Sequence, residues 1–220
     1  QALVLFTNGA AGDINIGYSS DASALGETMA FRSFETAERM AAILSERTSG
    51  LISGLTPWES PPLRVLPFTA RLPLKPNRPS PDDLLRQIEE IQETIDSART
   101  PDEKRAAAIR KIYLQSLLDT LALAGEGSIC EAPSLVIQLG HLMLITTPTE
   151  LFCEVGLALK QHIAAPLLSA VVGYAGGYVG YLPTAQAMQV GGYEAEVSPF
   201  DVDAADHFVR AAAQALQSFN

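Results

Sequence analysis

The chain has 220 residues, 47% of them hydrophobic, and its 25 acidic residues outnumber its 15 Lys and Arg residues, giving a formal net charge of −10. A length of this order suits one domain. Nucleic-acid binding depends on clustered cations, and the only such clusters here are the pairs Lys104-Arg105 and Arg110-Lys111, so no nucleic-acid partner is expected. No stretch approaches the roughly 18 apolar residues of a membrane span, so no transmembrane segment is expected.

Two further features of the composition bear on context. Cys130 and Cys153 are too few for a disulfide framework, and we expect two buried thiols. The sequence begins at Gln1 without an initiator Met, a positively charged n-region or the apolar h-region of a signal peptide. This beginning suggests a fragment of a longer protein.

The spacing of apolar residues predicts a mixed α/β fold. Ala2–Phe6 is expected to be a strand that runs into a loop at Gly9–Gly17. Ser33–Glu46 has helical spacing with Gly50 just past its end, and Leu63–Leu74 alternates as a strand does.

A long helical hairpin insertion is predicted over about residues 80–125. Ser80-Pro81-Asp82-Asp83 and Thr100-Pro101-Asp102-Glu103 each combine a cap, a proline at the first helical position and an acid at the third. Each start is followed by an apolar stripe with helical spacing, which we interpret as core. The stripes are Leu84, Leu85, Ile88, Ile91 and Ile95, then Ile109, Ile112, Tyr113, Leu117 and Leu121.

The C-terminal half is expected to alternate strands and helices. Leu135–Gln138 and Leu142–Thr146 are predicted strands joined by a Gly140-His141 turn, and a helix is expected to open at Thr147-Pro148-Thr149-Glu150. A strand at Leu168–Gly173 and a helix at Val202–Ser218 complete the predicted elements.

Residues 173–194 stand out because they hold four of the six tyrosines and six of the sixteen glycines. Glycine allows positive φ and close backbone approach. A tyrosine hydroxyl can donate or accept a hydrogen bond or, when deprotonated, bind a metal. The segment is either part of a site or a glycine-rich turn whose tyrosines fill gaps, and composition alone leaves both open.

Four motifs together resemble the neutral/alkaline (non-lysosomal) ceramidase family. Pro148-Thr149-Glu150 is similar to its Pro-Gly-Glu turn, Tyr181 to its loop tyrosine and Tyr193-Glu194 to its Tyr-Glu dipeptide. Asn8–Asn15 resembles its Gly-Asp-Val-Ser-Pro-Asn element. The order and approximate spacing of these motifs agree with those of the family over most of the chain. The resemblance therefore implies that residues 1–220 are the C-terminal part of a ceramidase-like catalytic domain.

The resemblance implies zinc-dependent hydrolysis of an N-acyl, lipid-like amide by a metal-activated water. It implies these site residues: Glu150 and Tyr181 as metal ligands, Asn15 and Tyr193 as catalytic residues, and Gly12, Asp13, Tyr178 and Gly192 as substrate contacts. The remaining zinc ligands are expected upstream of this chain, which implies association with an N-terminal part. A lipid or small-molecule amide is the expected partner, and a secreted or periplasmic location is implied by the family alone.

The sequence departs from the family in two ways. Asn15 and Ile16 stand where the family has Ser and Pro, and asparagine cannot be a nucleophile, although its NH₂ can donate to a developing oxyanion. The family's two metal-binding histidines are missing, and none of the histidines present has a His-x-His or His-x-x-x-His partner. We interpret all three as structural; they are His141, His162 and His207. The alternative function is therefore a non-catalytic ligand-binding relative.

Two acidic residues also have structural interpretations. Thr147–Glu150 matches a capping box, in which Glu150 would bond the Thr147 amide instead of a metal. Asp13 suits either a turn or a site. The Gly9/Gly12 pair lacks the glycine count and the lysine of a phosphate-binding loop, so we discount that function.

Overall fold

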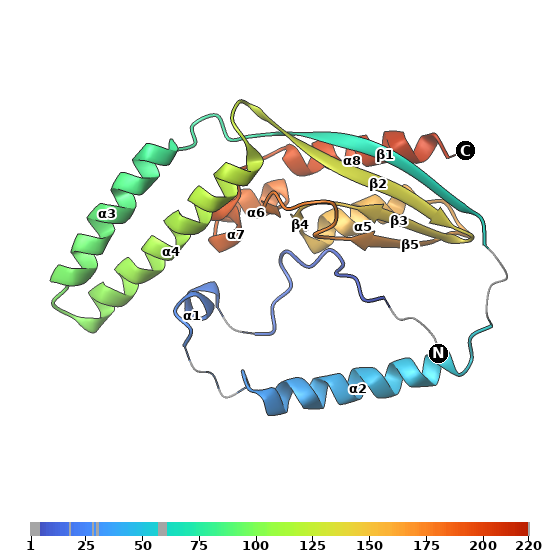
Figure 1. The fold of residues 1–220 in the computed structure, drawn as a ribbon, viewed down its shortest axis with the longest axis horizontal. Coiled ribbons are helices and arrows are strands. Elements are labelled where there is room, and N and C mark those ends of the chain that lie inside the picture. Colours follow the sequence, from blue (N-terminus) through green and yellow to red (C-terminus); the bar gives the residue numbers. More distant parts are fainter. Residues whose placement is uncertain (1–4, 18, 28, 30, 57–60, 220) are drawn as a thin grey trace. The chain divides into compact units, whose positions relative to one another are not determined.

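The computed structural model describes residues 5–17, 19–27, 29, 31–56 and 61–219 (Figure 1). The contacts of the chain divide it into two compact units, and the single domain predicted from its length stays a prediction. One unit comprises residues 1–17 and 62–220, and the other is Tyr18–Pro61. Each unit is described by itself.

The smaller unit contains the helices α1 (Ser20–Ala24) and α2 (Phe34–Ile52). The helix predicted at Ser33–Glu46 is confirmed as α2, and Ser33 caps it by accepting a hydrogen bond from the Thr36 amide at 3.2 Å. Its predicted end is wrong, because Gly50 lies inside the helix. A single glycine costs a helix only about 1 kcal/mol relative to alanine, so it does not have to end one.

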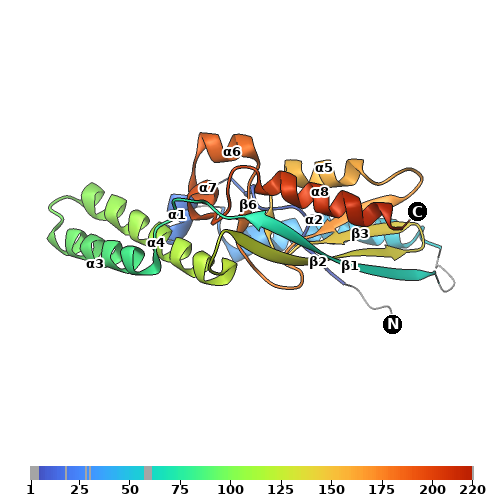
Figure 2. The ribbon, with the colours of Figure 1, turned by 90° about the horizontal axis from the view of Figure 1, so that it is seen from above.

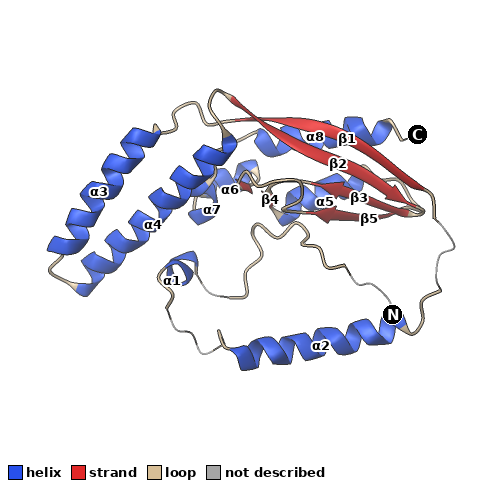
Figure 3. Ribbon diagram, in the orientation of Figure 1, coloured by secondary structure: helices blue, strands red, loops and turns tan. Residues whose placement is uncertain are grey.

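The larger unit is built on a four-stranded sheet in the order β1-β2-β3-β5 (Figure 3). Its strands are β1 (Leu63–Pro73), β2 (Ile129–Leu139), β3 (Leu142–Thr146) and β5 (Leu168–Val172). The β1–β2 and β2–β3 pairs are antiparallel and β3–β5 is parallel. The predicted mixed α/β class is confirmed.

The helices α5 (Cys153–Gln161) and α8 (Ala204–Gln217) lie together on one side of this sheet (Figure 2). Burial along β2 alternates from Cys130 to Val136, as expected for a strand with one covered face. The core includes these fully buried residues: Leu72, Val136, Ile145, Leu159, Phe200 and Phe208. Within the described residues, no helix is long and apolar enough to cross a membrane.

The predicted helical hairpin is confirmed as α3 (Pro81–Ser97) and α4 (Pro101–Ala124), followed by Gly125 at φ 84°. Thr100 and Glu103 form the expected capping box. At the start of α3, Ser80 Oγ accepts from the Asp83 amide at 3.1 Å and donates to Asp83 Oδ2 at 2.7 Å. Local signals thus specify both helix starts.

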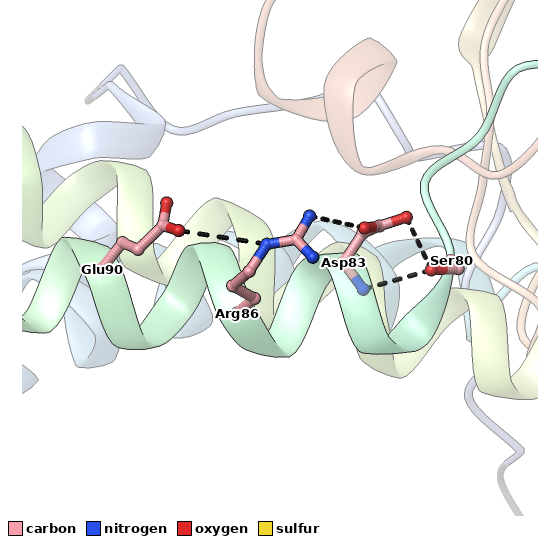
Figure 4. A network of polar contacts seen from close by, with 4 residues as sticks. All are labelled: Ser80, Asp83, Arg86 and Glu90. Carbon is pink, nitrogen blue, oxygen red and sulfur yellow. Dashed lines mark hydrogen bonds and ion pairs between the residues drawn. The ribbon is translucent and has the colours of Figure 1, made fainter.

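A line of polar contacts continues along the surface of α3 (Figure 4). The Arg86 guanidinium lies 2.6 Å from Asp83 Oδ1 and 3.9 Å from Glu90 Oε1. The hydrogen bond from Ser80 and then the Arg86 contact lower the pKa of the Asp83 carboxyl. All these groups are exposed, so the network supports the helix and does not form a site.

Two smaller predictions are wrong. Leu5 and Phe6 belong to no strand and are both 84% exposed, while residues 2–4 of the predicted strand lie outside the described residues. Cys130 is a buried free thiol as expected, but Cys153 is only partly buried. Cys153 begins α5, where one side of the helix faces outward.

Candidate functional site

Three segments that are far apart in sequence lie side by side in the larger unit. The Gly173 amide donates to Asn8 O at 3.0 Å, and the Gly12 amide donates to Leu151 O at 2.9 Å. The short strands β4 (Glu150–Leu151) and β6 (Tyr181–Leu182) pair in parallel, with Glu150 opposite Tyr181. Three predicted segments therefore meet at one place: the N-terminal motif Asn8–Asn15, the Glu150 motif Pro148-Thr149-Glu150, and the glycine- and tyrosine-rich residues 173–194.

Glu150 lies in a strand, and the predicted helix start at Thr147–Glu150 is wrong. The Glu150 amide donates to Gly180 O at 2.9 Å, and the helix begins only at Cys153. The capping-box alternative is wrong as well, because the Thr147 amide donates to Val172 O at 2.9 Å and not to Glu150. The Glu150 side chain is thus available for other contacts.

The N-terminal motif supplies the cap that α5 lacks locally. Asp13 Oδ1 accepts a hydrogen bond from the Cys153 amide at 2.7 Å. Gly12 is buried beside it, and a Cβ at this position would lie 2.5 Å from Glu150 O. The structure gives Gly12 and Asp13 these structural roles, and their predicted substrate contacts remain predictions.

The Glu150 carboxylate is held by two phenols. Tyr174 Oη donates to Glu150 Oε2 at 2.7 Å, and Tyr178 Oη donates to Oε1 at 2.5 Å. The two rings stack with centroids 6.2 Å apart and an interplanar angle of 7°. Sequence reasoning missed Tyr174. Its place in the glycine- and tyrosine-rich segment 173–194, four residues before Tyr178, was the available signal.

The electrostatics keep the phenols around Glu150 protonated. Burial, reinforced by the hydrogen bond to Glu150 and by its negative charge, raises the pKa of Tyr174 and of Tyr178. The pKa of Tyr181 is also raised, first by burial and then by the charge of Glu150 and a hydrogen bond to it. At neutral pH these three hydroxyls are hydrogen-bond donors, not phenolates.

Tyr193 connects this group to the helical hairpin. It begins the short helix α7 (Tyr193–Val197), which follows α6 (Ala185–Val190) and is capped by Gly192 at φ 110°. Its ring lies edge-on to Tyr181 at 5.8 Å and to Tyr113 of α4 at 4.9 Å. Its hydroxyl donates to Ser116 Oγ at 3.4 Å.

The five tyrosines within the described residues therefore form one connected group, which we call the tyrosine cluster: Tyr113, Tyr174, Tyr178, Tyr181 and Tyr193. Of the predicted site residues, Tyr178, Tyr181 and Tyr193 belong to this cluster, and Glu150 contacts it. Asn15 is exposed, and its Oδ1 accepts from the Gly17 amide at 2.9 Å. The predicted catalytic role of Asn15 and the substrate contact of Gly192 are not tested by these positions.

The described residues do not by themselves fit a zinc ion. Among them, no three His, Cys, Asp or Glu side chains gather closely enough to hold a metal. The two predicted ligands are one carboxylate, whose oxygens both accept phenol hydrogens, and a phenol whose raised pKa keeps it protonated. Zinc takes three or four ligands, preferentially thiolate, imidazole or carboxylate.

The histidines lie elsewhere in the fold, as expected for structural residues. His141 is in the β2–β3 turn and His162 ends α5. His207 lies in α8, with Nε2 3.3 Å from Asp203 Oδ2.

No protein-family model and no curated protein matches the chain. Among solved structures it is similar to a neutral ceramidase from Pseudomonas aeruginosa, with 14% identity and a TM-score of 0.42 over 72% of this chain and 28% of that one. It is also similar to a ceramidase complexed with C2, with 22% identity and a TM-score of 0.35 over 44% of this chain and 19% of that one.

The chain thus spans less than a third of either ceramidase. The likeness is distant and partial, and the function proposed below rests on the residues of the site.

Proposed function

We propose that the chain is part of a ceramidase-like hydrolase that cleaves an N-acyl, lipid-like amide. The observation that carries this proposal is the convergence of Glu150, Tyr181 and Tyr193. They come from three separate sequence motifs, yet Glu150 pairs with Tyr181 between strands and Tyr181 contacts Tyr193 ring to ring. A carboxylate surrounded by phenol donors is a polar centre suited to binding an amide.

The chain's own residues have distinct tasks in this proposal. The Tyr193 hydroxyl donates to the amide carbonyl oxygen and stabilises the negative charge that develops there. Tyr178 and Tyr181 stay protonated, and each can supply a further donor when a group of the substrate takes its place at Glu150. Glu150 accepts hydrogen bonds, and a donor group of the substrate can replace one of its phenol partners.

The metal-activated water that the resemblance implies belongs to this proposal only if zinc ligands come from outside the described residues. Glu150 and Tyr181 are the groups that this chain would offer to the ion. The substrate amide and a segment that completes the metal site are then the partners of the chain.

A non-catalytic ligand-binding function is the second candidate. It is favoured by Asn15, which stands where the resembled family has serine, and by the Glu150 carboxylate, whose two oxygens already accept hydrogen bonds. Such a protein would keep the tyrosine cluster as a binding surface and lack the reactive group.

The test uses the protein with its natural upstream sequence and N-acyl amides of short and long acyl chain, with and without added zinc. The enzyme proposal expects zinc-dependent release of the amine, lost in Glu150→Gln and kept in Glu154→Gln, an exposed control on α5. Binding of the amides without turnover, and turnover gained only in Asn15→Ser, would establish the second candidate instead.

A further inference from the structure

One face of α4 is directed at the site and not at α3. It carries Arg110, Tyr113, Ser116 and Thr120, whose spacing of three and four residues places them in one row. Arg110 Nη1 lies 3.1 Å from Glu196 Oε2 of α7. Thr120 is buried against Gly180, where an added Cβ would overlap its Cγ2. The row therefore contacts chain segments before and after Tyr193 in the sequence, at Gly180 and at Glu196.

Within this row, Tyr113 and Ser116 contact Tyr193 itself. The edge-to-face contact between the two rings has centroids 4.9 Å apart and an interplanar angle of 66°. The Tyr193 hydroxyl lies 3.4 Å from Ser116 Oγ, a long hydrogen bond that another acceptor can replace. One residue thus orients the ring, and the other contacts its polar tip.

The far end of α7 is held by Lys75 and Ser198 in addition to the Arg110–Glu196 contact with α4. Lys75 Nζ donates to Ala195 O at 2.8 Å and to Ser198 O at 2.6 Å. The hydroxyl of Ser198 donates to Tyr181 O at 3.0 Å. Since these bonds hold the last turn of α7 to β6 and to the chain after β1, a change at Ser116 should move the Tyr193 side chain without releasing the helix.

We propose that Tyr113 and Ser116 are positioning residues for Tyr193, which makes the helical hairpin part of the functional site. When a substrate carbonyl accepts the hydrogen bond from the Tyr193 hydroxyl, the Ser116 hydroxyl no longer accepts it. Ser116 can then donate a hydrogen bond to Tyr193 Oη, because a serine hydroxyl is both donor and acceptor. A phenol that receives a hydrogen bond is a stronger donor itself. The kinetic consequence rests on the proposed amidase function, whereas the orientation of Tyr193 does not.

The first arm of the test needs no activity. The protein with its upstream sequence is labelled with 3-fluorotyrosine, and the Tyr193 resonance is assigned by its loss in Tyr193→Phe. Ser116→Ala and Tyr113→Leu should shift this resonance, while Tyr113→Phe, which keeps the ring, and Gln115→Ala, an exposed neighbour on α4, should not. An unchanged resonance in both Ser116→Ala and Tyr113→Leu would overturn the proposal.

The second arm measures amide hydrolysis. Ser116→Ala should lower kcat about 10-fold with little change in KM, less than the 10²–10³ lost with an oxyanion donor itself. Ser116→Thr, which restores the hydroxyl, should recover the rate. Equal losses in Ser116→Ala and Ser116→Thr would contradict the role of the hydroxyl. A protein without turnover whose Tyr193 resonance still shifts would support the positioning and contradict the proposed function alone.

Discussion

Asp13 and the amide of Cys153 form a hydrogen bond of 2.7 Å across 140 positions of sequence. It caps α5 from a distant segment, since Phe152 at the N-cap position offers no side-chain hydrogen bond. It also fixes the N-terminal motif next to Glu150, because the neighbouring Gly12 donates its amide to Leu151. The bond is thus both a helix cap and an organiser of the site.

Removing this cap should destabilise the larger unit. Asp13→Ala is expected to lower the free energy of unfolding by about 1 kcal/mol, as for other lost N-caps, and Asp13→Asn by less, because its side-chain oxygen still accepts the hydrogen bond. Urea denaturation measures the difference. Glu154→Ala, which changes an exposed acid in the first turn of the same helix, is the control. Equal effects of Asp13→Ala and Glu154→Ala would mean that only charge matters.

Gly12 and Gly9 offer a matched pair of substitutions. A Cβ at Gly12 would lie 2.5 Å from Glu150 O, so Gly12→Ala must displace backbone and should cost about 1–3 kcal/mol as overpacking does. At Gly9 the nearest atom to an added Cβ is Val171 O at 3.9 Å, an ordinary contact. Gly9→Ala should therefore be nearly neutral in thermal unfolding. Comparable losses for both would contradict the close approach at Gly12.

Ionisation of Tyr174, Tyr178 and Tyr181 should oppose folding at alkaline pH. The pKa values of Tyr174, Tyr178 and Tyr181 are raised above the usual 10.0, so above that pH the folded chain binds more protons than the unfolded one. By linkage, the stability from these groups is complete below pH 10 and falls as the pH rises towards the folded pKa values.

Phenolate absorbance during an alkaline titration tests this expectation. Tyr174, Tyr178 and Tyr181 should ionise late or only on unfolding. In Glu150→Gln they should ionise earlier than in the unchanged chain, yet still later than free tyrosine, because burial remains. Ionisation of these three tyrosines near pH 10 in the folded chain would contradict their raised pKa values.

Zinc binding by the 220-residue chain should be weak. Its predicted ligands amount to one carboxylate and one protonated phenol, short of a zinc site. Calorimetric titration of the purified chain with zinc measures the affinity and stoichiometry. Tight binding of one ion, lost in Glu150→Gln, would mean that ligands other than those described complete the site.

The sequence was sufficient for elements whose signals are local. The α3–α4 hairpin follows from two capped, proline-started helices. The strand β3 and the end of β2 follow from apolar runs around Gly140, whereas the first part of β2, from Ile129, was not predicted. Glu150 was misplaced because Thr-Pro-Thr-Glu resembles a helix start, whereas its amide pairs with the distant Gly180. Strand pairing of this kind depends on chain contacts that no local pattern records.

The site was predictable only in part for the same reason. Glu150, Tyr178, Tyr181 and Tyr193 were found through motifs and residue chemistry, and they do come together. Tyr113 was assigned to a core stripe because helical spacing shows which residues share a face, not which partner the face meets. In α4 one side packs on α3 and another on α7, so apolar spacing could not reveal its contact with Tyr193.

Tyr193→Phe should separate an enzyme from a binding protein when the upstream sequence is present. A donor to the developing oxyanion acts mainly in the transition state, so its loss should reduce kcat by about 10²–10³ and change KM far less. The substitution keeps the ring contacts with Tyr113 and Tyr181 and removes only the hydroxyl that meets Ser116. Steady-state hydrolysis of an N-acyl amide with zinc present gives both constants. Unchanged turnover would keep the enzyme but remove this tyrosine from its chemistry, because the hydroxyl would then matter only for packing against α4.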